Sequence, residues 1–104
     1  MRIILDENIP LPIADLFQND TVTTVQQQGW AGIGNGELIG KINDTFDVFI
    51  TADKNLRYQQ NLKSRHIAIV ELFTNRLPLL TNHSQEIIDS LKSATPGSYI
   101  IVSQ

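Results

Sequence analysis

Two stretches of the sequence decide the fold, ILDEN at residues 4–8 and ITADK at residues 50–54. Each stands where an apolar, strand-like run stops and a helix is about to start. The carboxyl ends of the strands in a parallel α/β sheet converge on one crevice, so we expect Asp6 and Asp53 to face each other across it. Two carboxylates held close together repel, and a bound cation or a proton-transfer task is the usual reason for such a pair.

Outward from these stretches, strand-like and helical segments alternate along the chain. Short apolar or β-branched runs predict strands at residues 2–5, 21–25, 47–51, 66–71 and 98–103. Apolar residues at helical spacing predict helices at residues 8–17, 35–46 and 53–62, and in the second half of residues 77–93. Asn8 is the expected N-cap of the first helix, and Pro10 and Pro12 are expected in its first turn.

This alternation predicts right-handed βαβ units and a mostly parallel five-stranded sheet with helices on both faces. The 104 residues are enough for one core, so we expect a single three-layer α/β/α domain over residues 1–104. In the strand order 2-1-3-4-5, the switch point lies between the first and third strands, and ligands bind beyond their carboxyl ends. The sequence leaves open whether the last strand is parallel or antiparallel.

The composition excludes several classes of protein. The chain has no cysteine, which excludes disulfides and thiolate ligands and fits a cytoplasmic protein. No apolar run approaches the ~20 residues of a membrane span, and no signal peptide precedes the first strand, so we expect no membrane partner. The net charge of −3 argues against a broadly basic nucleic-acid binder.

A local basic cluster nevertheless follows Asp53 directly. Its members are Lys54, Arg57, Lys63, Arg65 and His66. A charged, solvated helix face is the alternative explanation of such a run.

Glu37 adds a third carboxylate, because it lies in the first turn of the helix after the second strand. With Asp6 and Asp53 it would form a site for a hard divalent cation, Mg²⁺ or Mn²⁺. Such an ion can deprotonate a water and stabilise the charge that develops on a phosphodiester during hydrolysis. The alternative explanations are a helix-capping role for Asp53 and a helix-dipole role for Glu37. Glu7 is expected to face solvent or to support the first turn of its helix.

Two polar residues extend this acidic site. Thr51 is placed to orient a carboxylate or to touch a phosphate, and Asn55 is placed to serve as an outer-sphere ligand. A β-forming residue at a strand end and an ordinary helix residue are the alternative explanations. The glycine-rich loop at residues 32–36 lacks the Walker lysine and is expected to be a flexible loop near the site. Trp30 is expected to pack rather than to stack on a base.

Three pieces of the sequence resemble the PIN-like nucleases, especially small PIN-like proteins related to VapC-type toxins. The pieces are IILDENIP at residues 3–10, GWAG at residues 29–32 leading to GEL at residues 36–38, and FITADKNL at residues 49–56. They occur in the order and spacing of that family. Beyond residue 56 the resemblance is one of architecture only.

The resemblance implies a Mg²⁺- or Mn²⁺-dependent endoribonuclease, often the toxin of a toxin–antitoxin pair. Asp6, Glu37 and Asp53 would take the positions of the acidic metal ligands, and both a cognate antitoxin and a homodimer would be in keeping with the family. Many relatives carry an acidic residue where this chain has Asn35 or Asn55. An amide brings no charge, so a second metal would be bound less tightly.

If the protein is such a ribonuclease, Lys54 and Arg57 are the residues that would engage the RNA backbone by charge. Two other functions compete with it. One is a PIN-like interaction module that has lost metal affinity and binds an antitoxin or another protein through an exposed groove. The other is a receiver-like phosphoacceptor domain, which needs a hydroxyl residue at the end of the fourth strand and a lysine after the fifth. Here the fourth strand ends in VEL at residues 70–72, and the chain ends in IVSQ at residues 101–104.

Overall fold

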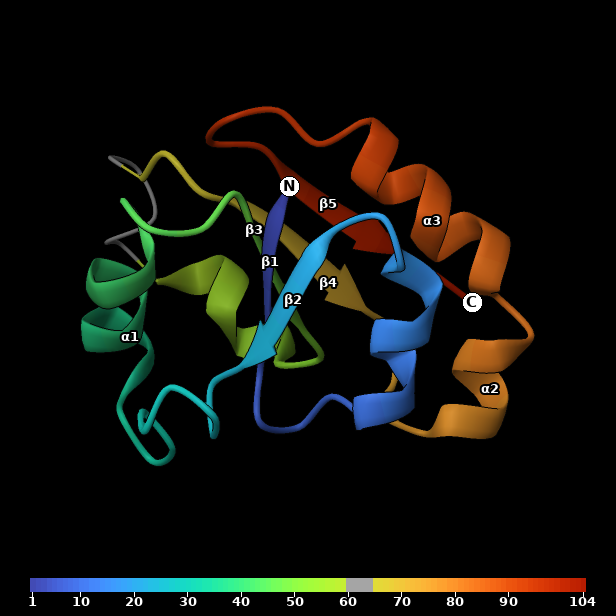
Figure 1. Ribbon diagram of the computed structural model, residues 1–104, viewed down its shortest axis with the longest axis horizontal. Coiled ribbons are helices and arrows are strands. Elements are labelled where there is room, and N and C mark those ends of the chain that lie inside the picture. Colours follow the sequence, from blue (N-terminus) through green and yellow to red (C-terminus); the bar gives the residue numbers. More distant parts are fainter. Residues whose placement is uncertain (60–64) are drawn as a thin grey trace.

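The computed structural model describes residues 1–59 and 65–104, and its centre is a parallel sheet of five strands (Figure 1). The strands lie in the order β2-β1-β3-β4-β5, and every neighbouring pair is parallel. Their bounds are β1 Arg2–Leu5, β2 Thr21–Thr24, β3 Val48–Thr51, β4 Ala68–Leu72 and β5 Tyr99–Val102. The predicted fold class is therefore confirmed, and the last strand is parallel.

Within the described residues, five short helical elements lie between the strands. They are η1 Leu11–Phe17, α1 Asn35–Ile42, η2 Lys54–Tyr58, α2 Leu77–Thr81 and α3 Ser84–Lys92, of which η1 and η2 are 3₁₀-helices. The helix predicted over residues 53–62 corresponds to η2, and its last part lies outside the described residues. The segment before α3 was not predicted to be helical, yet Leu77–Thr81 forms a helical turn with a proline at its start.

The predicted N-cap role of Asn8 is wrong. Pro10 occupies the N-cap position of η1, in an extended conformation and without a side-chain capping hydrogen bond. The residue before a proline is disfavoured in the helical conformation, so the helix cannot extend back through Ile9 to Asn8. Asn8 lies instead in a turn closed by the Ile9 N–H, which donates to the Asp6 carbonyl at 3.0 Å.

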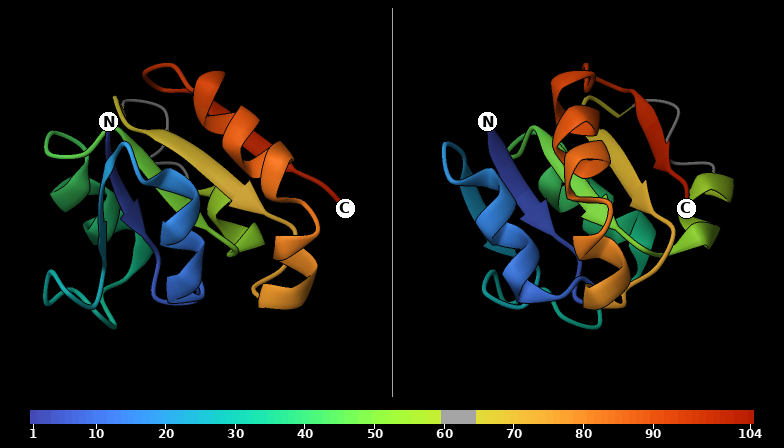
Figure 2. Two further views of the ribbon diagram at one scale, coloured as in Figure 1. Left: turned by 45° about the vertical axis from the view of Figure 1, so that its right-hand side comes forward. Right: turned by 90° about the vertical axis from the view of Figure 1, so that its right-hand side faces the viewer.

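The helical elements cover the two faces of the sheet unequally. In Figure 1, α1 and η2 lie on one side of the strands, and η1, α2 and α3 lie on the other. The right-hand view of Figure 2 shows η1, α2 and α3 in front of the sheet and α1 behind it. The core is correspondingly divided in two, with Leu5, Ile50 and Val70 in one cluster and Phe49 and Ile69 in the other.

The register of the central strands sets up a polar row at their carboxyl ends. Thr51 of β3 is paired with Glu71 of β4, and the Asp6 N–H donates to the Ile50 carbonyl at 2.8 Å, which places Asp6 beside Thr51. Because side chains alternate along a strand, these three residues lie on the α1 side of the sheet, one layer beyond Phe49 and Ile69. Asp6, Thr51 and Glu71 are only 7%, 0% and 1% exposed. This buried row forms the floor of the candidate site.

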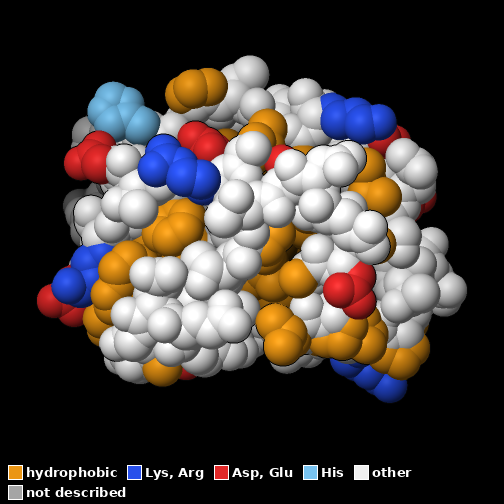
Figure 3. Space-filling view, in the orientation of Figure 1, with side chains coloured by type: hydrophobic (Ala, Val, Ile, Leu, Met, Phe, Trp, Pro, Cys, Tyr) orange, Lys and Arg blue, Asp and Glu red, His pale blue; other side chains and the backbone are white. Residues whose placement is uncertain are grey.

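One face of the surface is shown in Figure 3. Its Lys and Arg side chains lie apart from one another near the rim, and apolar side chains show through a hollow near the centre. Positive charge is therefore not gathered on this face. Within residues 1–59 and 65–104, no helix has the length and apolar character needed to cross a membrane.

Candidate active site

Asp6 is a buried carboxylate at the switch point between β1 and β3. Its Oδ2 accepts a hydrogen bond of 2.7 Å from the Thr51 hydroxyl, and its Oδ1 accepts one of 2.8 Å from the Glu7 N–H. Burial raises the pKa of Asp6, and the negative charges of Glu7 and Asp53 raise it further, although the two hydrogen bonds oppose the shift. The two strand-end acids meet through Thr51, which bonds to the Asp6 carboxylate and to the Asp53 N–H, as the strand order predicts.

Thr51 joins these two acids. Its hydroxyl donates to Asp6 and accepts a hydrogen bond of 3.0 Å from the Asp53 N–H. The side chain is completely buried, so both interactions are shielded from water. Thr51 therefore orients the Asp6 carboxylate and fixes the start of the segment that carries Asp53.

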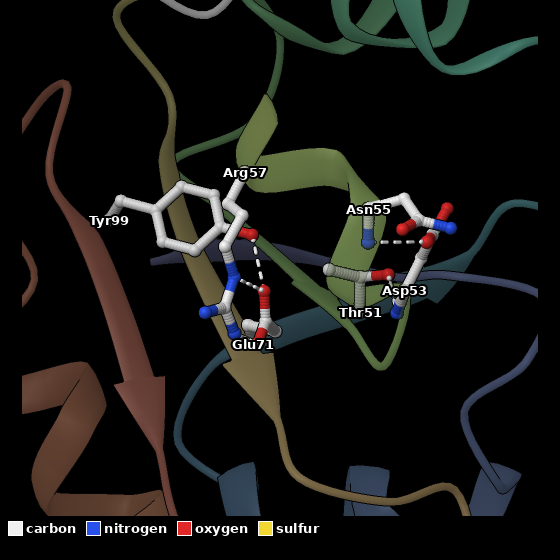
Figure 4. A network of polar contacts seen from close by, with 6 residues as sticks. All are labelled: Thr51, Asp53, Asn55, Arg57, Glu71 and Tyr99. Carbon is white, nitrogen blue, oxygen red and sulfur yellow. Dashed lines mark hydrogen bonds and ion pairs between the residues drawn. The ribbon is translucent and has the colours of Figure 1, made fainter. Parts of the chain in front are cut away.

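Asp53 is half-buried and occupies the N-cap of η2 (Figure 4). Its Oδ1 accepts from the Asn55 N–H at 3.0 Å, and its Oδ2 accepts from Asn35 Nδ2 at 2.9 Å. The capping explanation of Asp53 is thus confirmed. The bond from Asn35 also ties the first residue of α1 to the start of η2, which brings a third βα junction to the site.

The other predicted site residues lie at the rim. Glu37 is exposed in the first turn of α1, and Lys54 and Asn55 are exposed on η2. Asn55 contributes its backbone N–H to Asp53, whereas its side chain makes no polar contact with the described residues. In the described part of the chain, no group of three or more His, Cys, Asp or Glu side chains is arranged to hold a metal ion. The predicted trio with Glu37 is therefore not preassembled there.

The loop before α1 is held against the site by Glu7. The Glu7 Oε1 accepts a bond of 3.3 Å from the Gly32 N–H, and Gly32 has a φ of +80° that favours glycine. Trp30 packs edge-on against Phe46, with ring centroids 6.4 Å apart, as part of the core on the α1 side. The packing role predicted for Trp30 is confirmed.

Asn8 provides a polar atom that the sequence did not identify. Its Oδ1 is buried and accepts no hydrogen bond from the described residues. Such unsatisfied acceptors are rare in folded proteins and commonly mark the position of a water or an ion. Asn8 lies two residues after Asp6, so its amide oxygen is a further neutral oxygen that could serve as a ligand beyond the end of β1.

Glu71 is a buried acid near the candidate site that the sequence analysis did not identify as a site residue. Its Oε1 accepts from Arg57 Nε at 3.2 Å and from the Tyr99 hydroxyl at 2.7 Å, and its Oε2 accepts from Arg57 Nη2 (Figure 4). The ion pair joins η2 to β4, and Tyr99 joins both to β5. Glu71 raises the pKa of Arg57, and burial together with the bond to Glu71 raises the pKa of Tyr99. The available signal was an acid inside the apolar run IAIVEL at residues 67–72.

The donor set suits one hard cation. Mg²⁺ is usually held by one or two carboxylates and completes its octahedron with waters and phosphate oxygens. Asp6 and Asp53 supply two such groups, joined through the Thr51 hydroxyl. Burial is the main cause of the raised pKa of Asp6, and a bound cation would offset that cost together with the smaller repulsion by Glu7 and Asp53. The residues present therefore fit a single Mg²⁺ or Mn²⁺ ion better than a pair of ions.

Comparison of the chain with protein-family models, curated proteins and solved structures yields no match.

Proposed function

We propose that this protein is a cytoplasmic, divalent-metal-dependent endoribonuclease of the PIN-like class that acts as the toxin of a toxin–antitoxin pair. The observation that carries the proposal is the buried Asp6 carboxylate, joined through Thr51 to the start of the Asp53 segment at the topological switch point. Ligands of doubly wound α/β proteins bind at this point. RNA would be the substrate, and a cognate antitoxin would be the protein partner.

In this proposal, Asp6 and Asp53 hold the ion, and Glu37 completes or shares its shell from the first turn of α1. When bound, Mg²⁺ or Mn²⁺ would supply an activated water and charge stabilisation at the phosphodiester. Thr51 keeps the Asp6 carboxylate in one orientation through its 2.7 Å hydrogen bond. Lys54 is exposed on η2 and would attract the RNA backbone by charge.

A second candidate function is a PIN-like interaction module without metal chemistry. The observation that favours it is that both Asp53 oxygens already accept hydrogen bonds, one as the cap of η2 and one from Asn35. Such a module would bind its antitoxin or partner protein without any requirement for a cation.

Metal titration and RNA cleavage together separate the two functions. The test uses the wild type, Asp6→Asn and Asp53→Asn with a mixed single-stranded RNA and Mg²⁺ or Mn²⁺. Asparagine caps helices as well as aspartate does, so Asp53→Asn removes the charge and keeps the cap. Asp44→Asn is the matched control, because Asp44 is exposed and precedes β3, at the opposite end of the strand from Asp53.

The nuclease proposal predicts cleavage by the wild type and the control only. Mn²⁺ at about 100 times its Kd would raise the free energy of unfolding by about 2.7 kcal/mol, which thermal unfolding readily detects. Absence of cleavage by the wild type would refute catalysis. Cleavage by Asp6→Asn and Asp53→Asn at the wild-type rate would refute it as well. A wild type that Mn²⁺ does not stabilise would favour the interaction module.

Replacing Asn35 by aspartate should strengthen the metal site. The substitution converts the amide that donates to Asp53 at 2.9 Å into a carboxylate that repels it. Without metal, we expect the free energy of unfolding to fall by about 1–2 kcal/mol, because a hydrogen bond to a charged group is lost. With Mn²⁺, the additional charge should tighten binding about 10-fold. Calorimetric titration measures the affinity, and unchanged or weaker binding would place the ion away from Asp53.

A further inference from the structure

The ion pair between the partly exposed Arg57 and the buried Glu71 leaves one edge of the guanidinium available. Arg57 uses Nε and Nη2 to bind Glu71, whereas its Nη1 has no partner among the described residues. A guanidinium carries five N–H donors and can accept a second oxoanion along its outer edge. The Arg57 side chain is 34% exposed and that of Glu71 only 1%, so the carboxylate lies inside and the cation reaches solvent.

Tyr99 fixes the inner side of this pair. Its hydroxyl donates to the same Glu71 oxygen that accepts from Arg57 Nε. The guanidinium carbon of Arg65 lies 5.7 Å from the centroid of the Tyr99 ring, which packs against the core on the α1 side. Glu71 therefore has donors on both oxygens and no freedom to turn, and Arg57 is held in one orientation.

The position of Arg57 suits a strand of RNA that reaches the acids. Arg57 follows Asp53 by four residues on η2, and a 3₁₀-helix rises about 2 Å per residue, so their backbones lie about 8 Å apart along the axis. Arg57 therefore lies on the same short helix that Asp53 caps, and a strand that passes the acidic site can reach it. Figure 4 shows the two polar groups on either side of η2, with the strand ends below it.

We propose that Glu71 and Tyr99 are positioning residues that hold Arg57 so that the outer edge of its guanidinium binds a backbone phosphate of the RNA near the acidic site. The proposal rests on the proposed function for the identity of the ligand. It adds two residues to the site and distinguishes the roles of the two cations on η2. Arg57 binds a phosphate with fixed geometry, whereas Lys54 acts as an unanchored charge.

The direction in which Glu71→Gln changes RNA affinity shows whether Arg57 acts through its orientation or only through its charge. Glu71→Gln removes a negative charge behind Arg57, so it should tighten RNA binding if Arg57 acts only through its charge. If orientation matters, the same substitution should weaken binding, because the glutamine amide can accept only one of the two Arg57 donors. We expect about 3- to 10-fold weaker binding for Glu71→Gln and for Arg57→Gln, and a salt slope lower by about one for Arg57→Gln.

The measurement is fluorescence anisotropy of a labelled single-stranded RNA with EDTA, between about 50 and 200 mM salt. In an Arg57→Gln background, Glu71→Gln should cause no further loss. Tyr99→Phe keeps the ring, removes one donor and should weaken binding about twofold. If Glu71→Gln fails to fold, Tyr99→Phe tests the positioning role in its place. Thermal unfolding verifies the fold of each variant.

Tighter or unchanged binding by Glu71→Gln, or wild-type affinity of both Arg57→Gln and Tyr99→Phe, would overturn the inference. Because binding is measured without hydrolysis, the two proposals fail separately. A protein that binds RNA in this pattern but never cleaves it with Mn²⁺ would refute the nuclease and retain the role of Glu71. If the protein cleaves RNA normally and Arg57→Gln binds RNA as tightly as the wild type, the nuclease proposal is retained and the role of Glu71 is refuted.

Discussion

Asp6→Asn should abolish RNA cleavage and, in the absence of metal, make the protein more stable. Loss of an outer-sphere partner usually costs a metal site about 10- to 100-fold in affinity or activity, so loss of a direct ligand should reduce cleavage by more than about 100-fold. Asparagine has the same shape as aspartate. Its oxygen can accept from the Glu7 N–H, and its amide can donate to Thr51 if that hydroxyl turns.

The gain in stability follows from the pKa of Asp6. Burial raises this pKa above its ordinary value of 3.8, so folding favours the protonated carboxyl. The stabilising contribution is complete below pH 3.8 and is lost as the pH rises through the folded-state pKa. Asp6→Asn cannot lose it, so its advantage over the wild type should grow from acid to neutral pH. Urea unfolding at several pH values without metal measures this difference.

The outcome has two independent parts. A variant that is less stable than the wild type at neutral pH would contradict the burial of an ionised Asp6. A variant that still cleaves RNA would contradict its role as a ligand. Adding Mn²⁺ should reverse the order of stability, because only the wild type gains binding energy from the ion.

Thr51→Val should weaken the fold and the metal site together. The substitution preserves shape, but it leaves Asp6 without its side-chain donor and the Asp53 N–H without its acceptor. Leaving buried polar groups unsatisfied costs about 1–3 kcal/mol of unfolding free energy. The free Asp6 carboxylate can then turn, so we expect Mn²⁺ affinity to fall about 10- to 100-fold. Chemical unfolding and calorimetric titration measure the two effects.

Thr24 provides a matched control at the end of β2. It is buried, and its hydroxyl accepts a hydrogen bond of 3.0 Å from the Gln27 N–H, away from the acids. Thr24→Val should also destabilise the protein, but it should keep wild-type Mn²⁺ affinity and cleavage. Equal losses of affinity in the two variants would show that Thr51 acts only through general stability.

The strand order 2-1-3-4-5 was expected because strands and helices alternate as in common doubly wound proteins, and the burial of the central strands agrees with it. β3 and β4 are buried along their whole length, whereas the edge strands β2 and β5 are only partly covered. The link between Asp6 and Asp53 followed from that order, since both come at the carboxyl ends of adjacent strands. The strand order alone therefore locates the crevice at the carboxyl ends of β1 and β3.

The details of the site depended on geometry that one sequence does not encode locally. Because α1 follows the carboxyl end of β2, its first turn is expected near the crevice. The sequence does not specify whether the Glu37 side chain points inward. The partner of Glu71 is Arg57, 14 residues away, and their meeting depends on the register of β4 beside β3. An acid within an apolar strand indicates that a partner for its charge lies nearby. Only the packed sheet identifies it.

The capping bond of Asp53 would make any bound cation compete with the start of η2. The oxygen that accepts from the Asn55 N–H belongs to the carboxylate that would bind the ion, so occupancy of the site and winding of η2 are coupled events. A helix of five residues has few bonds to lose, which makes this competition mild. If an ion binds, a change in η2 would thus reach Arg57, the residue proposed to contact the RNA.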